Sequence, residues 1–325
     1  MSQPPVGFAA VRGHERRREF LRAAVAHERL PHALLFVGPE GVGKRSLALA
    51  LMTWLQCEHG GDDACGRCAA CRQMAAGSHL DFQLVTVAPG KKEVGIDRIR
   101  EVKRFMQLRP VGDKAKVVLI DDAHLLTVAA QNALLKVLEE PPARSFLVLV
   151  SNNPDALLAT VRSRCQRIHF GPLPIDTVVD ILTAGSDMDV ATARELAVLA
   201  EGSPGRALTL RKCLAGESRE QWRQRLAGLD QARYVRLAQT ATELNSPESQ
   251  VAAKLEMLLS QLRDDAVRSL RAEETAPDPS AATATSLRTI LQRADAAEAA
   301  WNLIRRGNPN RQLLLEALLL RLAAS

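Results

Sequence analysis

The chain is poor in aromatic residues and has no long hydrophobic run. Phe, Trp and Tyr make up 3% of its 325 residues, and no apolar stretch approaches the roughly twenty residues that cross a bilayer. The N-terminal residues MSQPPVGFAAVRGHERRR carry charge where a signal peptide has its apolar segment. We therefore expect a cytoplasmic protein without a membrane partner. Internal repeats and heptad runs long enough for a coiled coil are also lacking.

The composition supplies enough apolar material for several buried cores. With 46% hydrophobic residues in 325, two or three domains are expected. The C-terminal half is rich in Ala, Leu, Arg and Glu, a mixture that favours helices. A formal charge of +6 and a pI near 9.2 permit contact with a polyanion. With 43 basic residues against 37 acidic ones, this charge is weak evidence on its own.

An apolar strand near the N-terminus runs directly into a glycine-rich turn and a lysine, with the sequence LLFVGPEGVGKRS. This is the Walker A pattern, in which backbone N–H groups surround phosphates and the lysine reaches the outer ones. The residues that would bind nucleotide here are Gly38, Gly41, Gly43 and Lys44. Arg45 stands where the motif has the Ser or Thr that ligates magnesium. The pattern thus permits ATP to bind and argues against Mg²⁺.

Strand and helix patterns alternate as far as residue 170, which predicts a doubly wound α/β domain with a parallel sheet. The expected strands are residues 34–37, 82–87, 116–122 and 146–150, and the expected helices are 15–28, 44–56, 96–108 and 129–139.

After GPLP at 171–174 no strand pattern returns. Short helices are expected at 177–182 and 191–200, and the chain from 215 onward is predicted to be helical except for a proline-containing loop at 273–283. The last helix, at 311–323, is dense in leucine. The predicted domains are an α/β domain at 1–170, a helical lid at 171–210 and an all-α domain at 211–325.

Polar residues end two of the expected strands. Asp121 closes the buried strand KVVLI, one sheet position from the P-loop, where an acid can hold magnesium through water. Asp122 takes the place where an ATPase has the glutamate that orients water, and its shorter side chain withdraws the carboxylate; a misplacement of about 1 Å can cost roughly a hundredfold in rate. Asn152 ends the next strand, where it could sense a terminal phosphate, although polar strand ends are common.

Four of the six cysteines lie within one short segment, with the pattern C-x7-C-x2-C-x2-C. They are Cys57, Cys65, Cys68 and Cys71. This spacing lets four thiolates converge on one ion, so we expect a closed, structural Zn²⁺ site. Two disulfides or four free thiols are the alternatives; a reducing cytosol disfavours the first and the glycine-rich, polar loop the second. Cys165 and Cys213 are expected to be buried thiols.

Together these segments resemble the AAA+ clamp-loader family. The resemblance rests on GPEGVGK at 38–44, the four-cysteine insertion at 57–71, GIDRIREV at 95–102 and VVLIDDAHLLTVAAQNALLKVLEEPP at 117–142, and also on SRC at 163–165, GSPGRAL at 202–208 and NPNRQLLLEALLLRL at 308–322. It spans nearly the whole chain.

The resemblance implies an AAA+ P-loop domain, a small helical lid and a helical collar that joins a five-membered ring with gamma/tau and delta subunits. The family loads a sliding clamp onto primed DNA during replication. A stator subunit of this kind has little or no ATPase activity and donates the SRC arginine, here Arg164, to a neighbour's ATP site. Arg206 matches the residue that contacts nucleotide from the lid, and Arg98 matches a DNA-backbone contact.

Two other functions stay open at this stage. A gamma/tau-type motor that hydrolyses ATP would be favoured by an intact GKT or GKS and an Asp-Glu pair, and neither is present. A zinc-dependent nucleic-acid enzyme would need an open coordination position, which four thiolates do not leave. Arg164 could also be an ordinary surface arginine.

Overall fold

The computed structural model describes residues 6–112, 114–184, 188–214, 281–305 and 310–324, together with scattered residues between 239 and 270. Its contacts divide the chain into two compact units, Met1–Arg206 and Ala207–Ser325. None of the helices in the described ranges is long and apolar enough to span a membrane.

The first unit is built on a five-stranded sheet with the order β2-β3-β4-β1-β5. The strands are β1 Ala33–Val37, β2 Phe82–Val85, β3 Lys116–Ile120, β4 Ser145–Ser151 and β5 Gln166–His169. Every neighbouring pair is parallel, with registers such as Ala33 beside Leu147 and Leu34 beside Gln166. The predicted doubly wound α/β fold is confirmed.

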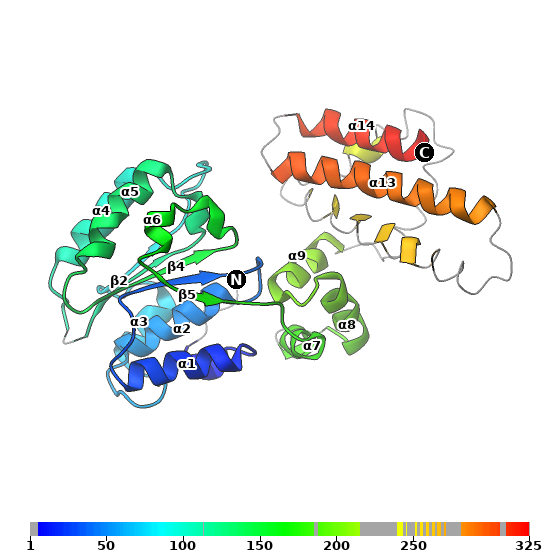
Figure 1. The fold of residues 1–325 in the computed structure, drawn as a ribbon. Helices are drawn as coiled ribbons and strands as arrows, with labels where there is room; N and C mark the ends of the chain where they lie inside the picture. The colour runs from blue at the N-terminus through cyan, green and yellow to red at the C-terminus, as the bar shows by residue number, and fades with distance from the viewer. Residues whose placement is uncertain are drawn as a thin grey trace. The chain divides into compact units, whose positions relative to one another are not determined.

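Helices cover both faces of this sheet (Figure 1), with α1, α2 and α3 on one face and α4 and α5 on the other. Their bounds are α1 Glu15–Ala26, α2 Lys44–Gln56, α3 Ala69–Ala76, α4 Ile96–Gln107, α5 Val128–Glu139 and α6 Ala159–Arg162. Successive strand residues point to opposite faces, so Leu34 and Phe36 join the core beneath α2, whereas Leu35 and Val37 join the core beneath α4 and α5. This two-sided burial explains the continuous apolar strands.

Three details differ from the sequence prediction. β5 was not expected, because its residues QRIH are short and polar and form an edge strand with only Ile168 buried. The cysteine segment contains a helix, α3, that was expected to be loop. β4 lies between β1 and β3, so Asp121 is one strand further from the P-loop than predicted.

A helical segment follows the sheet, with α7 Ile175–Ala184, α8 Val190–Leu199 and α9 Pro204–Leu214. Leu173 N–H donates to Gly202 O at 2.8 Å, which joins the residues before α7 to the turn between α8 and α9. In the second unit, α13 Ala281–Arg305 packs against α14 Arg311–Ala324, and Leu315, Leu318, Leu319 and Leu322 are buried. α13 begins within the predicted 273–283 loop; the rest of that loop and most of 215–270 lie outside the described residues. The boundaries at 170 and 210 stay predictions.

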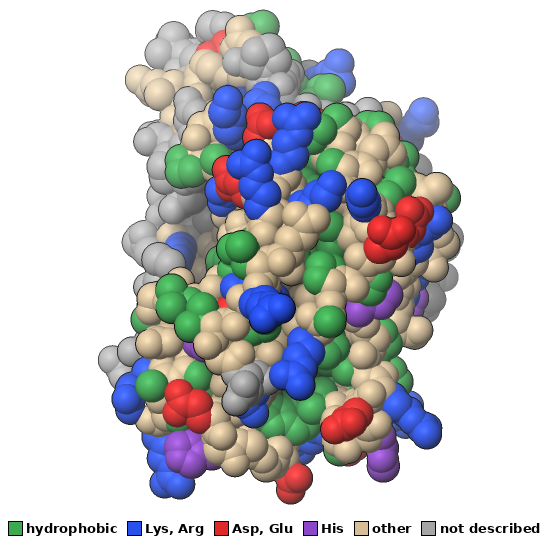
Figure 2. All heavy atoms as spheres, turned by 90° about the vertical axis from the view of Figure 1, so that its left-hand side faces the viewer, with side chains coloured by type: hydrophobic (Ala, Val, Ile, Leu, Met, Phe, Trp, Pro, Cys, Tyr) green, Lys and Arg blue, Asp and Glu red, His purple; other side chains and the backbone are tan. Residues whose placement is uncertain are grey.

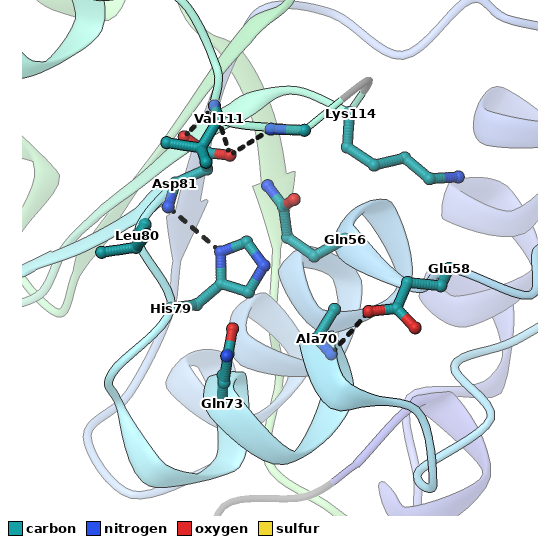
Figure 3. Close-up of a pocket in the computed structure, with 10 residues that line it drawn as sticks. Gln56, Glu58, Ala70, Gln73, His79, Leu80, Asp81, Val111 and Lys114 are labelled. Carbon is teal, nitrogen blue, oxygen red and sulfur yellow. Dashed lines mark hydrogen bonds between the residues drawn. The ribbon is translucent and has the colours of Figure 1, made fainter.

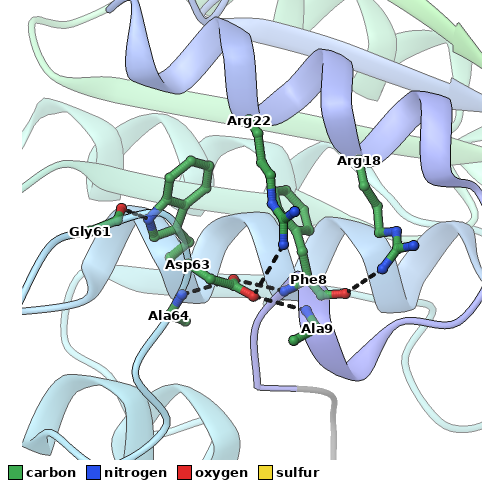
Figure 4. A network of polar contacts seen from close by, with 8 residues as sticks. Phe8, Ala9, Arg18, Arg22, Gly61, Asp63 and Ala64 are labelled. Atoms are coloured by element: carbon green, nitrogen blue, oxygen red, sulfur yellow. Dashed lines mark hydrogen bonds and ion pairs between the residues drawn. The ribbon is translucent and has the colours of Figure 1, made fainter.

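The cysteine insertion also holds the N-terminal segment in place (Figure 4). Asp63 accepts hydrogen bonds from the N–H groups of Phe8 and Ala9, both at 2.8 Å, and lies 3.7 Å from Arg22 of α1. The indole N–H of Trp54, in α2, donates to Gly61 O at 2.9 Å. Phe8 is fully buried against Trp54. The insertion is therefore part of the packing of this unit.

Candidate functional site

The P-loop connects the end of β1 to the start of α2. Gly38, Gly41 and Gly43 have φ angles of +151°, +74° and +104°, which an L side chain rarely adopts, so the turn requires glycine. Lys44 is buried, and its Nζ donates to Gly38 O at 2.7 Å and Pro39 O at 2.6 Å. Burial lowers the pKa of Lys44, against the opposing effect of Glu40, Asp121 and Asp122. The lysine thus lies folded over its own loop.

Residues 203–206 also contact the P-loop. Ser203 Oγ donates to Glu40 O at 2.8 Å, and Gly205 N–H donates to Gly41 O at 2.9 Å. A Cβ on Gly205 would lie 2.7 Å from Gly41 Cα, so only glycine allows this approach. On the other side, Nε2 of the buried His14 donates to Val42 O at 2.7 Å. The loop carbonyls are thus held by side chains and backbone around them.

Asp121 follows β3 and is already paired. Its Oδ2 lies 3.0 Å from Arg45 Nη1, and its side chain is 12% exposed. Burial raises the pKa of Asp121, the neighbouring Asp122 raises it further, and Arg45 opposes both. Asp122 is exposed, with a left-handed φ of +49°.

Arg45 and Asp121, the residues at the place where a P-loop protein binds magnesium, do not fit that ion. Residue 45 supplies no oxygen ligand, and the acid that would face the ion is held by a guanidinium, which stays charged at any physiological pH. We therefore derive no step through magnesium at this site.

Asn152 and Arg206 are the two remaining residues of this chain that were predicted to bind nucleotide. Asn152 follows β4, which is hydrogen-bonded to β1, and is half-buried. Arg206 Nη1 lies 3.4 Å from Glu201 Oε2, and its side chain is 34% exposed. The carboxyl ends of parallel strands share one edge, so the P-loop, Asp121, Asp122 and Asn152 lie along one border of the sheet.

Arg164 lies in the turn between α6 and β5, which the sequence prediction had placed beyond the last strand. Its Nη2 lies 2.8 Å from Glu139 Oε1, at the end of α5, and its Nη1 donates to Thr160 O at 2.9 Å. The side chain is 37% exposed. Two contacts thus hold an accessible guanidinium in one orientation.

Arg98 lies on the exposed face of α4, where it is paired with Glu101 at 2.6 Å. Arg100 is paired with Asp97 at 2.9 Å in the same way. Figure 2 shows the side of the molecule that carries α4, with Lys and Arg side chains standing beside Asp and Glu rather than in an unbroken basic patch. The helix has the predicted basic exterior, but these two arginines are partly neutralised within it.

The cysteine segment brings together a set of metal-binding atoms. The ligand atoms of Cys57, His59, Cys65 and Cys68 all lie within 4.8 Å of one another, and Cys71 Sγ lies 4.0 Å from Cys65 Sγ. Four sulfurs at tetrahedral zinc would lie about 3.8 Å apart, as Zn–S bonds of about 2.3 Å require. This donor set therefore fits a zinc ion.

Backbone N–H groups already point at three of these sulfurs. Cys65 N–H donates to Cys57 Sγ, Cys68 N–H to Cys65 Sγ and Cys71 N–H to Cys68 Sγ, at 3.3 to 3.4 Å. The N–H groups of Arg67 and Cys68 lower the pKa of Cys65 to about 6, which favours the thiolate that metals bind. Burial raises the pKa of Cys71.

Comparison with known proteins decides the family. A family model described as DNA polymerase III, delta subunit, matches residues 13–174. The DNA polymerase III subunit delta' of Pseudomonas aeruginosa is 33% identical over 310 residues, which cover 90% of this chain and 92% of that protein. The chain belongs to the DNA polymerase III delta' family.

Two further relatives of this delta' family member match over shorter segments. The Escherichia coli subunit delta' is 41% identical over 180 residues, so the matched part spans about half of either protein, 55% of this chain and 54% of the relative. The Bacillus subtilis DNA polymerase III subunit tau is 34% identical over 204 residues, 62% of this chain and 36% of that protein. Relatives of both the delta' and the tau type therefore match more than half of this chain.

A cavity of about 330 Å³ in this delta' family member lies beside α3, and no predicted site residue lines it (Figure 3). Its most buried charge is satisfied internally, because Asp81 lies 2.7 Å from Lys116 Nζ and accepts from Val111 N–H at 3.1 Å. Burial alone would raise the pKa of Asp81, but these partners outweigh it and lower the pKa. We assign this cavity no function.

Sequence reasoning missed three residues at these sites. His59 follows Cys57 at the spacing C-x-H, a signal that was available. Glu139 belongs to the LEEPP string, but nothing in the sequence pairs it with Arg164. Gly205 lies more than 160 residues from Gly41, and only the folded chain brings the two together.

Proposed function

We propose that this chain is a clamp-loader subunit of DNA polymerase III that acts as a stator. It joins gamma/tau and delta subunits in a five-membered ring and donates Arg164 to the ATP site of a neighbouring ATPase subunit. The ring loads the sliding clamp onto primed DNA, and this subunit touches the clamp little or not at all. Membership of the delta' family supports the assignment.

The observation that carries the stator role is the contrast between Arg164 and the chain's own P-loop edge. Arg164 is accessible and oriented by Glu139 and Thr160. An exposed ion pair contributes about 0–1 kcal/mol, so a neighbour's phosphate can displace Glu139 at little cost. At the P-loop edge, by comparison, Arg45 replaces the magnesium ligand and Asp122 replaces the longer acid. The chain thus has an arginine that can reach a neighbour's ATP site, and its own ATP site lacks residues that hydrolysis needs.

We propose that Cys57, Cys65, Cys68 and Cys71 hold a structural zinc ion. Cys57, Cys68 and Cys71 are buried, whereas His59 is exposed, so the four sulfurs can enclose the ion and leave His59 outside. When bound, zinc would supply cross-linking of the insertion rather than chemistry, since four thiolates leave no open position.

We further propose supporting roles for the two remaining arginines. Arg206 contacts nucleotide from the lid, next to the Ser203 and Gly205 contacts with the P-loop. Arg98 contacts the DNA backbone from α4 after its ion pair with Glu101 is broken, because a phosphate can replace a surface carboxylate as its partner.

The test is Arg164→Ala in a reconstituted loader. An arginine finger supplied in trans accelerates phosphoryl transfer by roughly 10³-fold or more, so hydrolysis at the adjacent site should fall by about that factor. Single-turnover ATP hydrolysis measures the effect, and gel filtration verifies that the ring assembles. Arg167→Ala, an exposed arginine on β5, is the matched control and should leave hydrolysis unchanged. Unaltered hydrolysis by an intact Arg164→Ala ring would refute the role.

A further inference from the structure

We propose that the P-loop of this chain is a magnesium-independent site for a nucleoside diphosphate, in which the Arg45 guanidinium, bonded to Asp121, takes the place of the divalent cation. The inference rests on the proposed function in one respect, that this P-loop performs no hydrolysis. It concerns what the loop binds, which the assignment of Arg164 does not decide.

Residue 45 carries a positive charge at the place of the magnesium ligand. Arg45 Nη1 lies 3.0 Å from Asp121 Oδ2, and the Arg45 side chain is 49% exposed while that of Asp121 is 12% exposed. A divalent ion entering here would meet a fixed positive charge and would have to break this pair. The guanidinium has five N–H donors and uses one of them on Asp121. The other N–H groups can donate to a phosphate, because the planar guanidinium matches the geometry of phosphate oxygens.

Among the described residues, the backbone carbonyl groups of the P-loop have hydrogen-bond partners, whereas most of its N–H groups do not. Each carbonyl from residue 38 to 43 accepts a hydrogen bond, from Lys44, Ser203, Gly205 N–H, His14 or Leu47 N–H. Within the described part of the chain, by contrast, the N–H groups of residues 40–46 have no acceptor. Carbonyls that already have donors and N–H groups left without acceptors are the arrangement that suits an anion. The N–H groups that would surround a phosphate are therefore in place, although Arg45 occupies the position of the magnesium ion.

Lys44 already donates hydrogen bonds to the P-loop itself. Its two hydrogen bonds to Gly38 O and Pro39 O, at 2.7 and 2.6 Å, compete with a phosphate for the same ammonium group. Binding exchanges these bonds for contacts to an anion, so affinity is moderate. The two cations, Lys44 and Arg45, then offset part of the negative charge of a diphosphate without a metal ion.

The experiment is calorimetric titration of the full chain with ADP, once with EDTA and once with excess MgCl₂. For the unaltered chain we expect binding in EDTA and a higher apparent dissociation constant in excess MgCl₂, because magnesium competes with the site for the diphosphate. Arg45→Thr restores the hydroxyl and frees Asp121, so magnesium should now strengthen ADP binding about tenfold or more, the gain of one contact to a charged group. Arg45→Lys keeps a cation at this position and should, like the unaltered chain, gain no affinity from magnesium.

Two variants serve as controls. Lys44→Ala should abolish ADP binding in both buffers, and Arg100→Thr, on the surface of α4, should bind as the unaltered chain does. Failure of the unaltered chain to bind ADP, or binding that requires magnesium, overturns the inference. Either result leaves the Arg164 assay of the assembled loader unaffected, so the two proposals fail separately.

Discussion

The cysteine cluster offers five side chains to an ion that takes four ligands. His59 is exposed and its ring lies 3.5 Å from Cys65 Sγ, whereas Cys71 is fully buried and its Sγ lies 4.0 Å from that same sulfur. Burial raises the pKa of Cys71, and a bound cation would reverse that effect by stabilising the thiolate. At the scale of single residues, whether His59 or Cys71 is the fourth ligand determines whether the site is closed by sulfur alone.

We predict that Cys71→Ser loses zinc while His59→Ala retains it. Removing one of four thiolates opens the coordination sphere, and the affinity should fall by roughly tenfold or more, as it does when a metal's supporting groups are removed. Zinc content by native mass spectrometry, after dialysis against a weak chelator, measures this. The reverse pattern would show that the site is made by three cysteines and His59.

At the scale of elements, the insertion 57–71 connects parts of the first unit that are distant in sequence. Its residue Asp63 accepts two N–H groups from the N-terminal segment, and its residue Gly61 accepts the Trp54 indole. Phe8 can stay buried on α2 because Asp63 satisfies its backbone N–H. The cysteine cluster and the contacts that hold the N-terminal segment therefore lie on one short loop.

We predict that Asp63→Ala loosens residues 6–12 without unfolding the sheet. Losing a charged acceptor costs about 1.5–3 kcal/mol per hydrogen bond, so amide exchange at Phe8 and Ala9 should quicken about 10- to 100-fold. Hydrogen exchange followed by mass spectrometry gives the measurement. Asp62→Ala changes the neighbouring exposed carboxylate and should have no effect. Equal protection in both variants would mean that Asp63 does not anchor this segment.

At the scale of the whole molecule, the chain matches both delta' and tau relatives, so the proposed distinction between a motor and a stator depends on a few side chains at one sheet edge. In this chain Arg45 and Asp122 occupy the places of a hydroxyl and a longer acid. Catalysis of phosphoryl transfer depends almost wholly on positioning and charge, so we expect either change to slow hydrolysis.

We predict that the isolated chain hydrolyses ATP no faster than the buffer does. A coupled phosphate-release assay with excess magnesium tests this, with Lys44→Ala as the control for contaminating ATPase. Turnover that disappears in Lys44→Ala would favour a gamma/tau-type motor over the stator role.

Much of the fold could be predicted because buried parallel strands are apolar throughout and their helices are amphipathic. The bounds of α2 agree with the prediction, and those of α4 and β1 differ by one residue. β5 was missed because an edge strand needs little apolar surface, and its pairing with β1 is set by the sheet rather than by its own residues. The order of β3 and β4 likewise depends on crossover connections that no local pattern encodes.

By itself, the sequence determined which chemical groups this protein has: a lysine in a glycine turn, an arginine where a hydroxyl is expected, and cysteines at metal spacing. Only the tertiary structure decided which groups meet. Arg45 with Asp121, Arg164 with Glu139, and Gly205 with Gly41 are pairs far apart along the chain. Their contact follows from long-range packing, because spacing along the sequence fixes local geometry but not the distance between elements.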